Sequence, residues 1–409
     1  MYNFAFANLY RQERGKNTGN ENSNDDGVNE ISKYTGVNRK IQDAYDEGND
    51  EGENGEVHVR IHTSLLDMQV AALDCLGKVL VHCFRAALPL LQNILGVVID
   101  ITTHFHEDLR TKAVQCLQNC VLAQYEMICT EHKVDPNVTP NELHETTKQL
   151  LEHIIPVLLY VMNLDADNEV AAACVECFQN FLQRLGPICY LLKGKNLIDP
   201  IMQQLLLFVQ GEGRCQKHNE YEDEDDEDDF EDHDHMLMDA VTDLIGAFAS
   251  ALGPHFSNYI KPFFQHLIKF LKPTKPASDR SMVVGCFAEI VDGLKGECAP
   301  YIPDLMQIAS TAIQDPDIKV QRNACFLIGV LVTHAPEESI IFQNFDAILT
   351  SLNPFFNIQS MGKLSTAEFA LIDNACSALA RIIMRAHSVI NIEEILPVFL
   401  RSLPLREDH

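Results

Sequence analysis

The chain is 409 residues long and 46% hydrophobic, and its 59 Asp plus Glu against 31 Lys plus Arg give a formal net charge of −28. This acidic balance excludes a phosphate-binding face as the main surface and predicts basic partners. The longest apolar run, residues 154–162, falls short of the roughly 20 residues of a membrane-spanning helix, and residues 1–15 lack the apolar core of a secretory signal. The 13 cysteines are therefore expected to be reduced thiols in the cytosol or nucleus.

Two regions differ in composition. Residues 1–60 are rich in Asn, Gly, Asp and Glu, and we predict that they form a disordered segment. From residue 61 onward, apolar residues recur every three or four positions between short polar turns, which is typical of amphipathic helices. One helix of each successive pair carries a proline, which bends a helix or lies near its start. These residues are Pro89, Pro156, Pro262, Pro303 and Pro397.

The partner helices resemble one another around a small residue in an apolar stripe. Successive small residues lie 39 to 66 positions apart by subtraction, against the about 40 to 47 of HEAT or armadillo repeats, and the longest interval contains an acidic insertion at 213–235. A single pair cannot bury its apolar face and must stack on its neighbours. Residues 61–409 are therefore predicted to be an all-α HEAT-repeat (armadillo-type) solenoid superhelix of about seven pairs. Its small residues are Ala72, Ala113, Cys174, Ala240, Gly285, Ala324 and Ala375.

Two helix starts are predicted from capping signals. Thr139 with Glu142, around Pro140, supplies an N-cap, a first-turn proline and a capping-box acid. Ser365 with Glu368 repeats the capping box. Both lie where a repeat is expected to begin.

The acidic run at residues 220–234, inside the insertion, is the first candidate binding site. Twelve of its fifteen residues are Asp or Glu. A run of this kind is often a solubilising loop. Here it interrupts a repeat between two helices, which we expect at 197–210 and 235–252, so it would be tethered over one face of the solenoid and could capture a Lys/Arg-rich ligand. The candidate cargo-binding residues are Glu222, Asp223, Glu224, Asp225, Asp226, Glu227, Asp228, Asp229, Glu231 and Asp232.

A second candidate set lies on the polar faces of the proline-free helices. Asp239 and Asp243 form an i, i+4 pair, and Glu289 and Asp292 form an i, i+3 pair. The plain interpretation is a solvated face. If these helices line the inner surface of the solenoid, the same carboxylates form a ladder for basic peptides.

Metal, cofactor and catalytic signatures are not expected in this chain. Cys174 and Cys177 have half of a zinc spacing, but no second Cys or His pair follows, and His233 and His235 lie in the acidic run, where repulsion in a loop is the simpler description. No phosphate loop or nucleophile signature appears, so we predict that the chain is not an enzyme. Most aromatics are expected in the core, and a minority could accept Phe-Gly motifs; the clusters are Tyr259, Phe263, Phe264 and Phe270 on one helix and Phe342, Phe345, Phe355 and Phe356 on another.

The chain resembles the importin-β (karyopherin) family, and within it the importin-four subgroup. The resemblance is carried by the acidic run leading into His-Met-Leu-Met-Asp at 235–239, by Tyr-Ile-Lys-Pro-Phe-Phe at 259–264, and by Ser-Met-Val-Val-Gly-Cys-Phe-Ala-Glu at 281–289. Further matches are Val-Gln-Arg-Asn-Ala at 320–324 and Asp-Asn-Ala-Cys-Ser-Ala-Leu-Ala-Arg at 373–381. Together the matches cover most of residues 57–409.

This resemblance implies a nuclear import receptor that shuttles between cytoplasm and nucleus. Such receptors bind basic cargo, here core histones and ribosomal proteins, contact Phe-Gly nucleoporins, and release cargo to Ran-GTP. The resemblance maps this chain to the second half of the family's repeats, so we expect a partial chain whose main Ran site lies in repeats that it lacks. The alternative is a HEAT-repeat scaffold of a phosphatase, chromatin or translation complex that does not depend on Ran.

Overall fold

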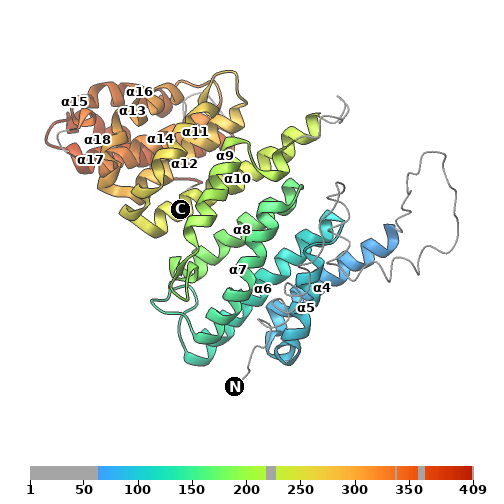
Figure 1. Ribbon diagram of the computed structural model, residues 1–409. Helices are drawn as coiled ribbons and strands as arrows, with labels where there is room; N and C mark the ends of the chain where they lie inside the picture. The colour runs from blue at the N-terminus through green and yellow to red at the C-terminus, as the bar shows by residue number, and fades with distance from the viewer. Residues whose placement is uncertain (1–62, 218–226, 337–338, 358–363, 408–409) are drawn as a thin grey trace, which may run out of the picture. The chain divides into compact units, whose positions relative to one another are not determined.

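The computed structural model describes residues 63–217, 227–336, 339–357 and 364–407, and within them the chain is almost wholly helical (Figure 1). The all-α prediction is therefore confirmed. The predicted disordered segment at 1–60 lies outside the described residues.

The helices alternate between two roles along the chain. The second helices of the pairs contact one another in sequence order, α4 with α6, α6 with α8, and so on to α14 with α17. They are α4 (Thr63–Ala87), α6 (Glu107–His132), α8 (Asn168–Leu185), α10 (Glu227–Leu252), α12 (Ala277–Leu294), α14 (Ile318–His334) and α17 (Thr366–Ala386).

The first helices of the pairs pack on this row. They are α5 (Leu91–Ile101), α7 (Glu145–Leu164), α9 (Ile198–Gln210), α11 (Ile260–Leu267), α13 (Ile302–Ala312), α16 (Phe345–Asn357) and α18 (Ile392–Arg401), with the short α15 (Ile340–Gln343) before α16. Short 3-10 turns lie between these helices, and they are η1 (Leu88–Leu90), η2 (Pro187–Tyr190), η3 (Arg214–Gln216), η5 (Gly253–Asn258), η6 (Ile268–Leu271) and η7 (Lys295–Tyr301).

The predicted small residues mark the second helices. Each of the seven falls in a different member of the row from α4 to α17. Close packing explains the small side chain in α12, because a Cβ at Gly285 would lie 3.0 Å from the side-chain nitrogen of Asn323 in α14. The apolar face of α12 is buried, with Phe287 and Ile290 each 1% exposed. The repeat pattern in the sequence therefore reports real packing contacts.

Bidentate ion pairs join second helices to the loops of the following repeats. Arg280 of α12 donates to both carboxylate oxygens of Asp315 at 2.8 and 2.9 Å, and Arg110 of α6 makes the same pair with Asp165. Two residues after each acceptor, Asp317 and Asp167 accept from backbone N–H groups and cap α14 and α8. In each Asp-x-Asp sequence, the first Asp therefore joins the loop to a second helix and the second Asp caps the next helix.

One of the two predicted helix starts is correct. Ser365 and Glu368 form the capping box at the start of α17. The start predicted at Thr139 is wrong, because α7 begins at Glu145, where the His144 ring accepts from the Thr146 N–H. Thr139 instead packs against Gly186. The φ angle of Gly186 is 72°, which residues other than glycine rarely adopt.

A short hairpin follows α8, which the sequence reading did not predict. Strands β1 (Leu191–Leu192) and β2 (Lys195–Asn196) pair antiparallel around Lys193 and Gly194, whose φ angles are 48° and 73°. Positive φ at both central residues is the signature of a type I′ turn. Within the described residues these are the only strands.

Two helical segments, Ser64–Ile101 and Asp234–Asn258, are long and apolar enough to cross a membrane by length and composition. Both include second helices of the row, and 56% of the apolar window of the second segment is buried inside the protein. A core helix of a soluble protein has the same composition, so these segments are weak evidence for a membrane span.

Candidate functional site

Only the second half of the acidic run lies within the described residues. Its residues up to 226 lie outside the described range, whereas Glu227, Asp228, Asp229, Glu231 and Asp232 belong to α10. The prediction of a loop as far as residue 234 is therefore wrong, because the helix expected at 235 begins at Glu227. Acidic residues in the first turns favour a helix because they oppose the positive end of its dipole.

One hydrogen bond joins a residue shortly before the run to the last residue of the run. Gln216, in the 3-10 turn after α9, donates its amide to the Asp234 carboxylate of α10 at 2.8 Å. Cys215 beside it is buried at 4% exposure. The base of the acidic run is thus attached to the repeat formed by α9 and α10.

Three of the four carboxylates predicted on the second helices meet at one hollow. Asp239 and Asp243 of α10 and Glu289 of α12 line a cavity of about 240 Å³. The other lining residues are partly polar and partly apolar and come from α10, α12 and α14. They are Thr242, Met282, Gly285, Cys286, Arg322, Asn323 and Phe326. Met282 and Phe326 could pack on the aliphatic part of a Lys or Arg side chain while carboxylates meet its charged end.

Glu289 is the most perturbed carboxyl in the hollow. Its side chain is exposed, but one oxygen, Oε2, lies so close to α10 that a Cβ at Gly246 would be 1.8 Å from it. Removal of this carboxyl from water raises the pKa of Glu289 to about 7, and the charge of Asp243 adds to the shift. Glu289 therefore keeps its proton to a higher pH than an ordinary glutamate does.

The pKa values of Asp239 and Asp243 are also raised. Burial is the main cause that raises the pKa of Asp239 and of Asp243, and the charge of Asp239 adds to the effect at Asp243. The exposed Glu176 of α8 also raises the pKa of Asp243, so it extends the negative field toward the preceding repeat. Sequence reasoning missed Glu176 because it lies within the Cys-Val-Glu-Cys stretch that was considered only for zinc.

Asp292 does not belong to the hollow. Its carboxylate oxygen lies 2.9 Å from the Nε2 atom of His334 at the end of α14. The structure therefore separates the predicted Glu289–Asp292 pair, with Glu289 facing α10 and Asp292 facing α14.

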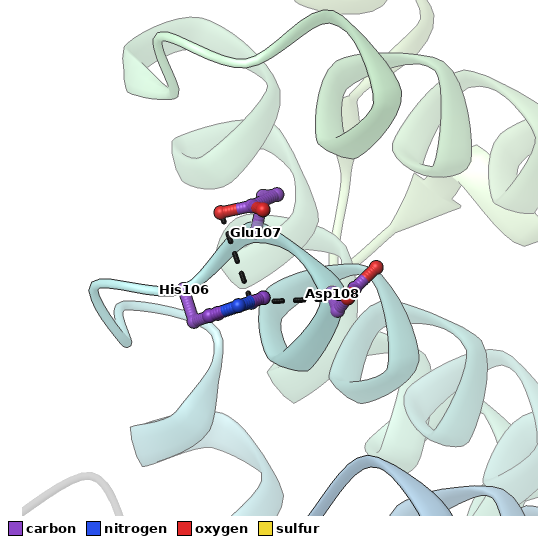
Figure 2. Close-up of side chains that lie close together, drawn as sticks. All are labelled: His106, Glu107 and Asp108. Carbon is purple, nitrogen blue, oxygen red and sulfur yellow. Dashed lines mark ion pairs between the residues drawn. The ribbon is translucent and has the colours of Figure 1, made fainter. Parts of the chain in front are cut away.

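A possible metal cluster occurs at the start of α6 (Figure 2). The His106 Nδ1 atom lies 3.7 Å from Glu107 Oε2 and 3.9 Å from Asp108 Oδ2. Glu107 is half-buried and Asp108 is exposed, and both occupy the first helical turn, where the helix dipole stabilises their negative charge even without an ion. Cys174 and Cys177 are buried at 0% and 1% exposure, and burial raises the pKa of both thiols, so they are core residues.

The predicted aromatic clusters are largely core. Phe263, Phe345 and Phe355 are buried at 1%, 5% and 5% exposure. The four C-terminal phenylalanines were expected on one helix, but Phe342 belongs to α15 and the other three to α16.

A family model described as "Importin subunit beta-1-like, TPR repeats" matches residues 230–328, which include the hollow. "Probable importin subunit beta-4" of Schizosaccharomyces pombe is 24% identical over 349 residues, covering 84% of this chain and 32% of the relative. "Importin-4" of Homo sapiens is 24% identical over 349 residues, covering 85% of this chain and 30% of the relative. This chain thus spans about a third of the length of the curated relatives that it matches.

Solved structures of Kap121p share the fold. The complex with Ste12p has a TM-score of 0.65 at 15% identity and covers 88% of this chain and 33% of that one. Kap121p bound to RanGTP and Kap121p bound to Nup53p match with TM-scores of 0.63 and 0.64, at 15% identity in each case. They cover 85% and 88% of this chain and 31% and 33% of those chains.

The packing of paired helices and the shared fold define the fold class as an all-α HEAT-repeat solenoid. The predicted resemblance to the importin-β family is confirmed, since the matching family model and both named relatives are importins.

Proposed function

We propose that this chain is the cargo-binding part of a nuclear import receptor that recognises basic protein segments through carboxylates on its second helices. The observation that carries the proposal is the hollow at which Asp239, Asp243 and Glu289 converge from two consecutive repeats. Carboxylates beside an apolar wall suit a Lys or Arg side chain, whose stem and head differ in polarity. Arg322 lines the α14 side of the hollow, so the negative charge is concentrated toward α10 and α12.

The acidic run at residues 222–232 is proposed to act before the hollow. Dense negative charge raises the encounter rate of a basic segment, and its attachment through Gln216 and Asp234 keeps it beside the α9–α10 repeat. Core histones and ribosomal proteins are the proposed cargo classes. The chain would carry them through the nuclear pore between cytoplasm and nucleus as a binding protein without catalytic activity.

Binding of a fluorescent Lys/Arg-rich histone-tail peptide tests the hollow. Asp239→Asn, Asp243→Asn and Glu289→Gln together should weaken binding at least tenfold. The matched control removes three exposed acids from first helices, Asp304→Asn, Asp346→Asn and Glu393→Gln, and should change binding less than threefold. Equal losses in the two variants would show a general charge effect and refute a specific site.

Ran-dependent release distinguishes the receptor from the alternative, a HEAT-repeat scaffold of a phosphatase, chromatin or translation complex. Kap121p, which shares the fold, has been solved with RanGTP and with Nup53p. We propose that a polypeptide as long as the relatives releases basic proteins when Ran-GTP is added and binds Phe-Gly nucleoporins. The test is a cytosol pull-down with and without Ran-GTP, followed by identification of the released proteins. Retention of the same proteins in both conditions would support the scaffold.

A further inference from the structure

A second cavity lies earlier in the row of second helices, between α4 and α6. Its volume is about 130 Å³, and its walls include Asp74, Lys78, Lys112, Gln115 and Asn119. We call it the lysine cavity. The hollow between α10 and α12 occupies a similar place between two consecutive second helices, so the two can be compared position by position.

A thiol contact between helices occurs in both places. The Cys116 thiol of α6 donates to the carbonyl oxygen of Leu73 in α4 at 3.3 Å. The Cys286 thiol of α12 donates to the carbonyl oxygen of Thr242 in α10 at 3.7 Å. All four residues line their respective cavities. These contacts fix which residues of the two helix pairs correspond.

A glycine four residues after each carbonyl makes room for a side chain of the next helix. A Cβ at Gly77 would lie 3.2 Å from the Nδ2 atom of Asn119, three residues after the α6 cysteine. A Cβ at Gly246 would lie 1.8 Å from the Oε2 atom of Glu289, three residues after the α12 cysteine. The lysine cavity and the hollow are therefore built on the same backbone arrangement.

The corresponding positions carry fewer carboxylates in the lysine cavity. Of the three carboxylates in the hollow, the one that directly follows the accepting carbonyl is kept, as Asp74. Val70 and Asn119 occupy the positions of the other two. Most of the negative charge of the hollow is thus absent here.

Two lysines are added around the remaining carboxylate. Lys112 occupies the position of Met282 and donates to the Gln115 side chain at 3.2 Å. Lys78 donates to Asp74 at 2.6 Å. The hydrogen bond and charge of Lys78 lower the pKa of Asp74, and the charge of Lys112 adds to this effect, so both ammonium groups act on one place. After Asp74 is neutralised, one positive charge is left in excess.

We propose that the lysine cavity binds a single carboxylate, supplied by an Asp or Glu side chain of the same protein segment whose Lys or Arg side chain occupies the hollow. A carboxylate between the two ammonium groups accepts charge-assisted hydrogen bonds, and the half-buried Asn119 amide supplies a further donor. One excess positive charge matches a carboxylate and not a phosphate, which carries close to two negative charges. The link to the basic side chain rests on the proposed function, but the carboxylate site does not.

The row of second helices sets the spacing of such a ligand. Neighbours in the row contact one another in the order α4, α6, α8, α10 and α12, so three helix spacings separate the lysine cavity from the hollow. Packed helices lie roughly 8 to 10 Å apart, which gives roughly 24 to 30 Å. An extended segment rises about 3.3 Å per residue, so its acidic and basic residues should lie about seven to nine positions apart.

A short peptide tests the carboxylate site without any basic residue. Acetyl-Gly-Glu-Gly-amide at millimolar concentration should give saturable NMR shifts of the Gln115 and Asn119 side-chain amides, and the same peptide with Gln in place of Glu should give none. The shifts should disappear in Lys78→Gln with Lys112→Gln. They should persist in Lys133→Gln with Lys195→Gln, which removes two exposed lysines outside both cavities and gives the same net charge. Absent shifts, or shifts that both variants keep, would overturn the carboxylate site.

A longer peptide tests the link to the hollow. A Lys-Arg pair followed eight residues later by Glu should bind at least threefold more tightly than the same peptide with Gln. A general charge effect predicts the opposite order, because the protein has a net charge of −28. The preference should vanish in Lys78→Gln with Lys112→Gln, remain in Lys133→Gln with Lys195→Gln, and vanish when Glu lies only three residues from the pair.

The two peptide experiments separate the two parts of the proposal. Equal binding of the Glu and Gln peptides by the original chain would overturn the link between the cavities. If neither longer peptide bound, the proposed function would fail, while the short-peptide shifts would still decide the carboxylate site.

Discussion

At the scale of single residues, the Arg280–Asp315 pair is a bidentate charge contact, like that of Arg110 with Asp165. Both side chains are largely buried, at 13% and 12% exposure, and the two bonds are of normal length. The hydrogen bond from Arg280 holds the pKa of Asp315 below its usual value. A buried pair of this kind is costly to break from one side because the partner charge then lacks compensation.

We predict that Asp315→Asn lowers the free energy of unfolding by about 1 to 3 kcal/mol at pH 7. Because the folded pKa is depressed, the contribution of the pair is present above the unfolded pKa near 3.8 and is lost as pH falls through the folded value. Urea unfolding at pH 7 and at pH 3 should therefore show the two proteins converging in acid. The control, Asp74→Asn in the exposed pair with Lys78, should leave the unfolding midpoint unchanged.

Glu289 gives the opposite pH dependence. Its folded pKa of about 7 lies above the usual 4.5, so the folded state holds a proton that the unfolded state releases between these values. Stability of the original chain should fall relative to Glu289→Gln as pH rises from 4.5 to 7, and the difference should then stay constant. Since the side chain is exposed, we expect about 1 kcal/mol between pH 5 and pH 8, less than the shift alone implies.

The pKa of Glu289 can be checked through the charged groups that surround it. Asp239 and Asp243 face it from α10, and Arg322 lines the hollow from α14. Carbon-13 NMR of the carboxyl should show a midpoint near 7 that falls in Asp243→Asn, because one negative charge is removed. A midpoint near 4.5 in the original chain would contradict the shift caused by the close packing of this carboxyl against α10.

Residue spacing predicted part of this site. The i, i+4 spacing of Asp239 and Asp243 placed both on one helix edge, and the structure brings them to one cavity. The i, i+3 spacing of Glu289 and Asp292 could not show that the two side chains face different neighbouring helices. Glu289 packs against Gly246 and Asp292 contacts His334, and both of these residues are distant in sequence.

At the scale of helices, glycine sets how closely two second helices approach. Gly293→Ala should destabilise the protein by about 1 to 3 kcal/mol or more, because its methyl group would lie 2.3 Å from backbone atoms of Ala249 that cannot move without shifting α10. Gly96→Ala in α5 is the matched control, since nothing lies within 4 Å of its Cβ, and helix propensity predicts a small gain. Urea unfolding midpoints of the two variants should therefore move in opposite directions.

Helix ends were less predictable than helix faces. The capping box at Ser365 depends only on local residues and is confirmed. The start predicted at Thr139 has the same local signal, but Thr139 is held against Gly186 after α8, and His144 caps α7 instead. Capping motifs state where a helix can begin, and contacts between repeats select among the possible starts.

Terminal helices should be the least protected elements. No residue of α18 is buried, and α4 exposes Leu65 and Met68, whereas α12 and α14 pack between neighbours. In a repeat array each element is stabilised by its nearest neighbours, so a helix with a missing neighbour opens more easily. Amide hydrogen exchange should be at least tenfold faster in α4 and α18 than in α12 and α14. Equal protection along the chain would contradict this account.

At the scale of the whole molecule, the sequence predicted the repeat architecture because one packing arrangement recurs. A small residue in each second helix and a proline in many first helices survive as a pattern even though the repeats differ elsewhere. The site is harder to predict because its residues occur in one place only and do not recur from repeat to repeat. Glu176 and Arg322 come from α8 and α14 and have no repeated signature, so only their positions in the row connect them with Asp243 and Glu289.

Long-range charge gives the final prediction. Replacing the acids at 222–232 with Asn and Gln should slow association with a basic histone-tail peptide about tenfold in low salt and change dissociation less, because steering acts on encounter. The Debye length is about 8 Å at physiological salt, so raising NaCl from 50 to 300 mM should slow the original chain strongly and the variant only slightly. Circular dichroism of the variant checks that the row of helices is intact, with at most a small loss from the first turns of α10. If the variant associates as fast and with the same salt slope, capture depends on Asp239, Asp243 and Glu289 in the hollow instead.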